Sequence, residues 1–148
     1  MLVMSVALEK EQVSEAFGFD AAAFLKKVKD EVGVGKVRLV FDGDKSRAHA
    51  IHVGEICQIH LPTREAIQRE RGFDAKTAIA KQKAALAEES CHCREHETDH
   101  NEAVVTCTIK MMKKHKTPEE LELPYIKEKV RRLEMSPERV EKLQPLPS

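Results

Sequence analysis

The sequence predicts an α+β fold with a four-stranded sheet and helices packed on one of its faces. Two observations lead to this prediction: some stretches alternate apolar and polar residues as strands do, and others space apolar residues as helices do, between clear capping residues. In chain order the elements read strand, helix, strand, strand, helix, strand. This is the βαββαβ order of the ferredoxin-like folds, with their split β-α-β arrangement. We expect a core domain over residues 1–116 and a helical C-terminal extension over residues 117–148.

The first half of the chain supplies a weak strand, a helix and two stronger strands. Residues 1–8 alternate loosely, which is the weakest part of the assignment. Asp20 is a favourable N-cap for a helix that Gly33 ends. Residues 36–42 and 48–61 alternate more clearly, with a turn signal between them and Pro62 after them. We expect these two segments to pair as an antiparallel hairpin.

The second half is predicted to be mainly helical, with one further strand. Thr63 caps a helix that runs to about Arg71, and Asp74 begins another that runs to about Glu89. The apolar alternation over residues 103–111 predicts the last strand of the sheet. Helix starts at Thr117 and Ser136, each followed by a proline, then open the C-terminal extension.

Residues 91–107 hold most of the side chains that could bind a metal. The segment opens with the pattern C-x-C-x2-H-x3-H, and thiolate and imidazole are the ligands that zinc prefers. We expect one zinc ion on four ligands, which would stabilise the fold without an open position for substrate. The alternative is a polar linker that happens to carry histidines. The expected ligands are Cys91, Cys93, His96 and His100, with His92 and Cys107 as possible additional ligands.

Five of these residues also resemble a catalytic motif. His96-Glu97-Thr98-Asp99-His100 is similar to the H-E-x-x-H motif of the zincin metalloproteases, which implies two histidines on zinc and Glu97 as the general base. The match is short and lies in a strongly charged segment that a strand is predicted to follow. We therefore expect the match to be accidental, and we keep a metal-dependent hydrolase as the alternative function.

A second candidate site lies on the outward face of the predicted sheet, where His52, His60 and Arg38 would lie close together. A pair of histidines could cleave RNA by acid–base chemistry. The face offers no aromatic residues for base stacking, which disfavours an RNA-recognition sheet. Cys57 is expected to pack in the core, since its neighbours on the same strand face are apolar.

The composition leads to the remaining expectations. The chain has 148 residues, with 25 basic and 25 acidic side chains, one tyrosine and no tryptophan. With no net charge, nucleic-acid binding is possible but not favoured, and no apolar run is long enough for a membrane span. The four cysteines, without a recognisable secretion signal, suggest an intracellular protein with free thiols or metal ligands. We expect a binding or assembly module without catalytic activity, whose partner is another protein or a second copy of the chain.

Overall fold

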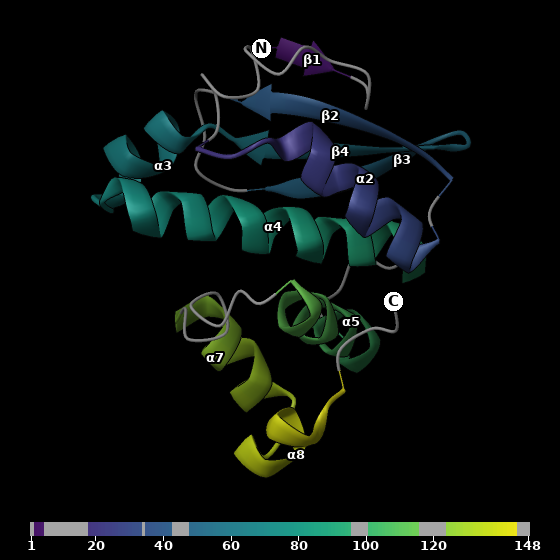
Figure 1. Ribbon diagram of the computed structural model, residues 1–148, viewed down its shortest axis with the longest axis vertical. Coiled ribbons are helices and arrows are strands. Elements are labelled where there is room, and N and C mark those ends of the chain that lie inside the picture. Colours follow the sequence, from purple (N-terminus) through teal and green to yellow (C-terminus); the bar gives the residue numbers. More distant parts are fainter. Residues whose placement is uncertain are drawn as a thin grey trace.

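The computed structural model describes residues 2–4, 18–33, 35–42, 48–95, 101–115 and 124–144. The described part is an α+β fold in which the sheet, helices α2 and α4, and helices α5, α7 and α8 lie in successive layers (Figure 1). The strands form one mixed sheet in the order β1-β2-β4-β3. The strands are β1 (Leu2–Met4), β2 (Lys36–Asp42), β3 (His49–Val53) and β4 (Ile56–Pro62). The helices are α2 (Ala21–Val32), α3 (Arg64–Arg71), α4 (Ala75–Glu95), α5 (Glu102–Lys114), α7 (Pro124–Arg132) and α8 (Pro137–Lys142).

Four helices begin at the residues that the sequence predicts, among them α8 at Ser136. Asp20 accepts a hydrogen bond from the backbone N–H of Ala23 at 3.1 Å, and Thr63 caps α3 in the same way. The Asp74 carboxylate accepts one from Thr77 at 2.7 Å at the start of α4. Gly33, with φ of 69°, ends α2 in the left-handed conformation that glycine adopts without strain. These predictions are confirmed. A cap joins residues only three or four positions apart, so the sequence alone contains the information needed to predict it.

The predicted hairpin between residues 36–42 and 48–61 is wrong. Residues 48–61 contain two strands, β3 and β4, which pair antiparallel around a turn at Gly54 and Glu55. Strand β2 pairs with β4 in parallel. Across this two-residue turn, each odd-numbered residue of one strand lies opposite an even-numbered residue of the other, as Ile51 lies opposite Gln58. Odd-numbered residues therefore point to one face of the sheet in β3 and to the opposite face in β4. The glycine turn was hidden inside what looked like one long alternating run.

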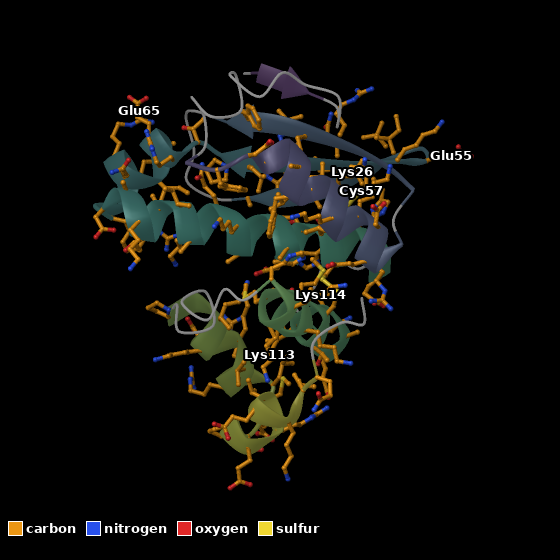
Figure 2. The ribbon with its side chains drawn as sticks, in the orientation of Figure 1. Lys26, Glu55, Cys57, Glu65, Lys113 and Lys114 are labelled. Carbon is orange, nitrogen blue, oxygen red and sulfur yellow. A yellow bond between two sulfur atoms is a disulfide. The ribbon has the colours of Figure 1, made fainter. Side chains whose placement is uncertain are left out.

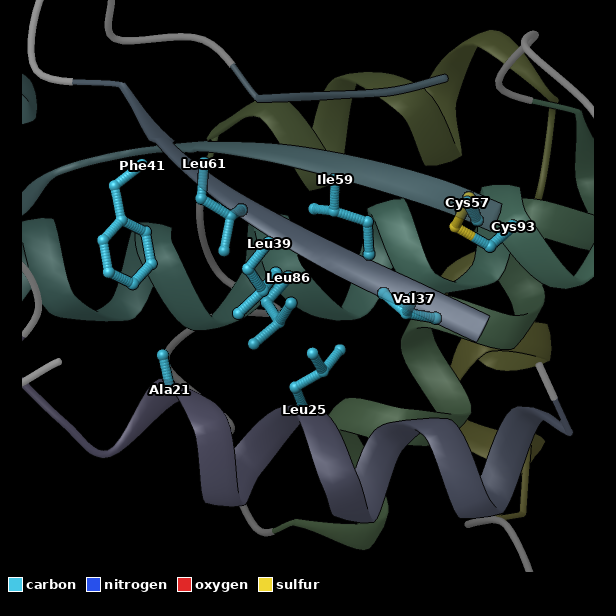
Figure 3. Close-up of a cluster of buried hydrophobic side chains, with 10 residues drawn as sticks. All are labelled: Ala21, Leu25, Val37, Leu39, Phe41, Cys57, Ile59, Leu61, Leu86 and Cys93. Atoms are coloured by element: carbon cyan, nitrogen blue, oxygen red, sulfur yellow. A yellow bond between two sulfur atoms is a disulfide. The ribbon is translucent and has the colours of Figure 1, made fainter. Parts of the chain in front are cut away.

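The main hydrophobic core lies between the sheet and helices α2 and α4. Alternate residues of β2 and β4 point to the helices, as the period of two requires. Leu25 of α2 and Leu86 of α4 are fully buried against them, and Figure 3 shows these side chains converging. The strand residues of this cluster are Val37, Leu39, Phe41, Cys57, Ile59 and Leu61. The predicted inward faces of β2 and β4 are therefore confirmed.

The strand expected over residues 103–111 is wrong, because these residues form most of helix α5. The β-branched residues favour a strand by intrinsic propensity, but Asn101 caps the helix through the N–H of Val104 at 2.9 Å. Val104 and Met111 pack on α4, whereas Val105 and Ile109 pack toward α7 and α8. Burial on two sides of the helix leaves only a narrow polar stripe, Glu102, Thr106 and Lys110, whose spacing of four residues is helical but easily missed. The ferredoxin-like order is not confirmed, since its last strand is absent from the described elements.

Lysines of α5 connect it to α8 in its own layer and to α2 in the layer above. The Lys113 ammonium donates hydrogen bonds to the carbonyls of Val140, Glu141 and Leu143, at 2.5 to 3.0 Å, beside the end of α8. Lys114 forms an ion pair of 2.9 Å with Glu31 of α2. Figure 2 labels both lysines. Such contacts, with the apolar cluster around Met135, tie the C-terminal helices to α5.

Candidate functional site

The last turns of α4 carry two cysteines that point to opposite sides of the helix. Successive residues of an α-helix are about 100° apart, so Cys91 and Cys93 project about 200° apart. Cys93 forms a disulfide with Cys57 of β4, with a Cα–Cα distance of 5.9 Å. Cys91 forms one with Cys107 of α5, with a Cα–Cα distance of 6.0 Å. The two bonds therefore clamp α4 to the sheet on one side and to α5 on the other.

The expected zinc ligands are not brought together in the described part of the chain. Cys91 and Cys93 face different layers, and each is bonded to another cysteine. His96, Glu97 and His100 lie outside the described residues. A disulfide sulfur is not the thiolate that zinc requires. Zinc binding thus stays a prediction, and the structure adds disulfide formation as a competing state of the same cysteines.

His92 instead joins a buried cluster with two carboxylates that the sequence analysis missed. Ligand-type atoms of Glu88, Glu89 and His92 lie within 4.8 Å of one another. The Lys129 ammonium of α7 donates to Glu88 Oε1 at 2.6 Å, and His92 Nε2 lies 3.7 Å from the same oxygen. A metal ion could use one atom from each of the three residues, but Lys129 already supplies a positive charge there. We interpret the cluster as a buried ion-pair network that fixes α7 on α4.

Burial changes the proton affinity of this cluster. It raises the pKa of Glu89 to about 7, since desolvation disfavours the charged form; His92 and Lys129 act in the opposite direction, and Glu88 adds to the rise. On the same helix, burial lowers the pKa of Lys81 to about 8, helped by repulsion from Arg71 and Lys129. The i, i+4 spacing of Glu88 and His92 was the available signal in the sequence, since such residues share one face of a helix.

The outer sheet face contains only part of the predicted histidine site. Arg38 and His60 belong to this face, but the register pairs His52 with Cys57 and therefore places it on the other face. His49 takes the expected position: its ring stacks on that of His60 with centroids 4.2 Å apart. His60 Nε2 lies 3.1 Å from Gln58 Oε1. The error follows directly from the hairpin turn that the sequence analysis missed.

Comparisons with models of protein families, with curated proteins and with solved structures found no match to this chain. Among the described residues, no helix is both long enough and apolar enough to cross a membrane. The assignment of a function therefore depends on the geometry of the chain itself.

Proposed function

We propose that the chain is a non-catalytic assembly module that pairs with a second copy of itself through the edge strand β3. The observation that supports this proposal is the exposure of Ile51 and Val53, 45% and 57%, on one face of that strand. They are the exposed large hydrophobic residues of the described part of the chain. Apolar residues left accessible together often belong to an interaction surface.

The position of β3 in the sheet supports the same proposal. Among the described strands, β3 is at the end of the sheet order and pairs only with β4, so its outer edge presents backbone N–H and C=O groups. Edge strands are commonly protected against pairing by lysines, prolines or bulges. The segment His49-Ala50-Ile51-His52-Val53 contains no lysine, glutamate, aspartate, arginine or proline. It is therefore suited to β-augmentation.

A two-fold arrangement is compatible with this strand. If two β3 strands pair antiparallel about His52, Ile51 of one copy lies opposite Val53 of the other, and the reverse. Cross-strand apolar pairs of this kind stabilise a sheet by about 0.2–1 kcal/mol each. Two copies would form a continuous sheet with a closed, symmetric contact.

The other expectations remain alternatives to this proposal. A metal-dependent hydrolase would use the H-E-x-x-H residues. A nuclease or nucleic-acid-binding module was expected to use Arg38, His52 and His60, and on the observed outer sheet face His49 takes the place of His52. Three further expectations are likewise proposals: that zinc stabilises the fold, that the fold is ferredoxin-like, and that the protein is intracellular. An intracellular location would expose the two disulfides to thiol reductants.

Ile51→Lys is expected to weaken self-association by at least about tenfold in Kd, because the two-fold axis places the new charge in the contact twice. Sedimentation velocity over a concentration series measures the effect. The control is Glu65→Lys on α3, which makes a larger change of charge than Ile51→Lys, at an exposed position away from β3. A wild-type chain that stays monomeric at the highest soluble concentration would exclude the proposal, as would a dimer unaffected by Ile51→Lys.

Zinc and the disulfides are expected to exclude one another. Oxidised protein should contain almost no zinc, and protein reduced under argon with added zinc should take up about one ion per chain. Elemental analysis after desalting gives both values. Zinc absent from the reduced protein would make the zinc prediction wrong, and equal zinc in both forms would shift attention to Glu88, Glu89 and His92.

A further inference from the structure

A cavity of about 430 Å³ lies beside the Cys91–Cys107 disulfide. It is formed by the end of α4, one side of α5 and the start of α8. This volume is within the range of small-molecule sites. Among its lining residues are Arg94, Thr106, Cys107, Lys110 and Arg139.

Only one of the two bonded cysteines lines this cavity. Cys107 is 5% exposed, whereas Cys91 is fully buried among apolar residues that include Val28, Val104 and Met111. A thiolate must approach a disulfide sulfur directly to attack it, so access selects the sulfur that reacts. The Cys107 sulfur is therefore the electrophile that a molecule in the cavity would reach.

The charges of the cavity favour a negatively charged molecule. Three cations, Arg94, Lys110 and Arg139, face two carboxylates, Glu95 and Glu102. Glu95 lies 3.5 Å from Arg94, and Glu102 is paired with Arg139. Within the described part of the chain, Lys110 has no ion-pair partner, so it contributes the excess positive charge.

Two further features of the cavity point to a ligand there: an unpartnered hydroxyl and an arginine beside the reactive sulfur. The hydroxyl oxygen of Thr106 is buried and has no hydrogen-bond partner among the described residues, although it borders the cavity. A buried hydroxyl normally finds a partner, and a bound polar molecule could supply one. The Arg94 guanidinium lies 4.0 Å from Cys107 Sγ, close enough to stabilise a thiolate formed there.

We propose that the Cys91–Cys107 pair is a thiol–disulfide exchange site for a small anionic thiol. The incoming thiolate attacks Cys107 Sγ, a bond forms between the two sulfurs, and the bond to Cys91 breaks. Cys91 leaves as a thiolate and takes a proton from water. A second molecule of the same thiol, as its thiolate, then attacks the mixed disulfide at the sulfur that came from the first molecule. It releases the oxidised thiol dimer and a Cys107 thiolate beside Arg94, so that two electrons pass from two thiols to the protein disulfide.

The other disulfide of the chain is an internal control. Cys57 and Cys93 belong to the core cluster between the sheet and the helices. Cys57 is as exposed as Cys107, at 5%, but neither Cys57 nor Cys93 is among the residues that line this cavity with its cations. Exchange at Cys107 should therefore precede exchange at Cys57 or Cys93 in the folded protein. Released thiols can be alkylated after an acid quench and assigned by peptide mass spectrometry.

The experiment compares three thiols on the full oxidised chain: glutathione, which is anionic, 2-mercaptoethanol, which is neutral, and cysteamine, which is cationic. Lys110→Glu is expected to slow exchange with glutathione by about fivefold or more, since it replaces attraction by repulsion and the glutathione thiolate carries two net negative charges. Exchange with 2-mercaptoethanol, whose thiolate carries one, should slow less. Exchange with cysteamine, whose ammonium group offsets the thiolate, should change least. Because each thiol is compared with itself across variants, differences in intrinsic thiol reactivity cancel.

Lys26→Glu, on the exposed surface of α2, is the matched control, since it makes the same change of charge away from the cavity. It should leave all three rates near those of the wild type. The proposal is overturned if Lys110→Glu changes the three rates equally, if Cys57–Cys93 opens first, or if the mixed disulfide forms on Cys91.

A second variant traps the first intermediate. Cys91→Ala leaves the Cys107 thiol without its partner, and oxidised glutathione should then form a stable mixed disulfide on Cys107 faster than cystamine does. Equal rates for the two disulfides would count against an anion-selective cavity. If this variant does not fold, the wild-type and Lys110→Glu rates decide the question.

Discussion

Replacing Cys57 and Cys93 together by alanine is expected to lower the free energy of unfolding by about 4 kcal/mol. The bond joins residues separated by 36 positions, so its loss frees a long loop in the unfolded chain. It also removes the covalent link between β4 and α4 across the main core (Figure 3). Urea unfolding of the oxidised variants and of the oxidised wild type measures the difference.

The second disulfide provides the comparison. Cys91 and Cys107 are 16 positions apart, so their joint replacement by alanine should cost less, about 3 kcal/mol. Reduction of the wild type should combine both effects. If neither pair of substitutions shifts the unfolding midpoint, the disulfides do not form in solution. In that case the zinc alternative regains its ligands.

The stability of the chain is expected to fall as the pH rises from about 4.5 to about 7, through the titration of Glu89. Its pKa is raised from 4.5 to about 7 in the folded state, so the folded chain binds this proton more tightly than the unfolded chain does. The contribution is fully present below 4.5 and is lost as the pH passes the folded pKa. At pH 8 the loss amounts to about 3 kcal/mol.

Glu89→Gln tests this expectation, because glutamine resembles the protonated acid and does not ionise. Urea midpoints at pH 5 and pH 8 should differ less in the variant than in the wild type, and the variant should be the more stable protein at pH 8. Histidine side chains in general change charge between pH 5 and pH 8, so the difference between the two proteins is the measured quantity. Glu65→Gln, an exposed position on α3, is the control and should follow the wild type. A variant with the wild-type pH dependence would show that Glu89 is ionised in the fold without penalty.

Local signals in the sequence were sufficient for the elements that begin at caps. Asp20, Thr63, Asp74 and Ser136 each accept a backbone hydrogen bond from a residue three positions later. The inward residues of β2 were likewise readable, since alternation with a period of two needs no knowledge of the partner strand. The buried state of Cys57 was also predicted correctly from its apolar neighbours, although its bond to Cys93 was not.

Two segments have local sequence patterns that fit more than one secondary structure, and in both the tertiary structure determines which one forms. Residues 103–111 are rich in β-branched side chains, but burial against α4 on one side and α7 and α8 on the other makes them a helix. Residues 48–61 alternate as one strand would, but the turn at Gly54 divides them and moves His52 off the face of His60. Neither outcome depends on short-range spacing alone.

The sequence by itself determined the α+β class, the capped helices and the place where reactive side chains concentrate. The tertiary structure decided what those side chains meet. Cys91 and Cys93 are two positions apart in a pattern typical of metal binding. Because the segment is helical and lies between two layers, each cysteine faces a different partner. Which partner each one faces depends on how β4 and α5 pack on α4, and packing is a property of the whole fold.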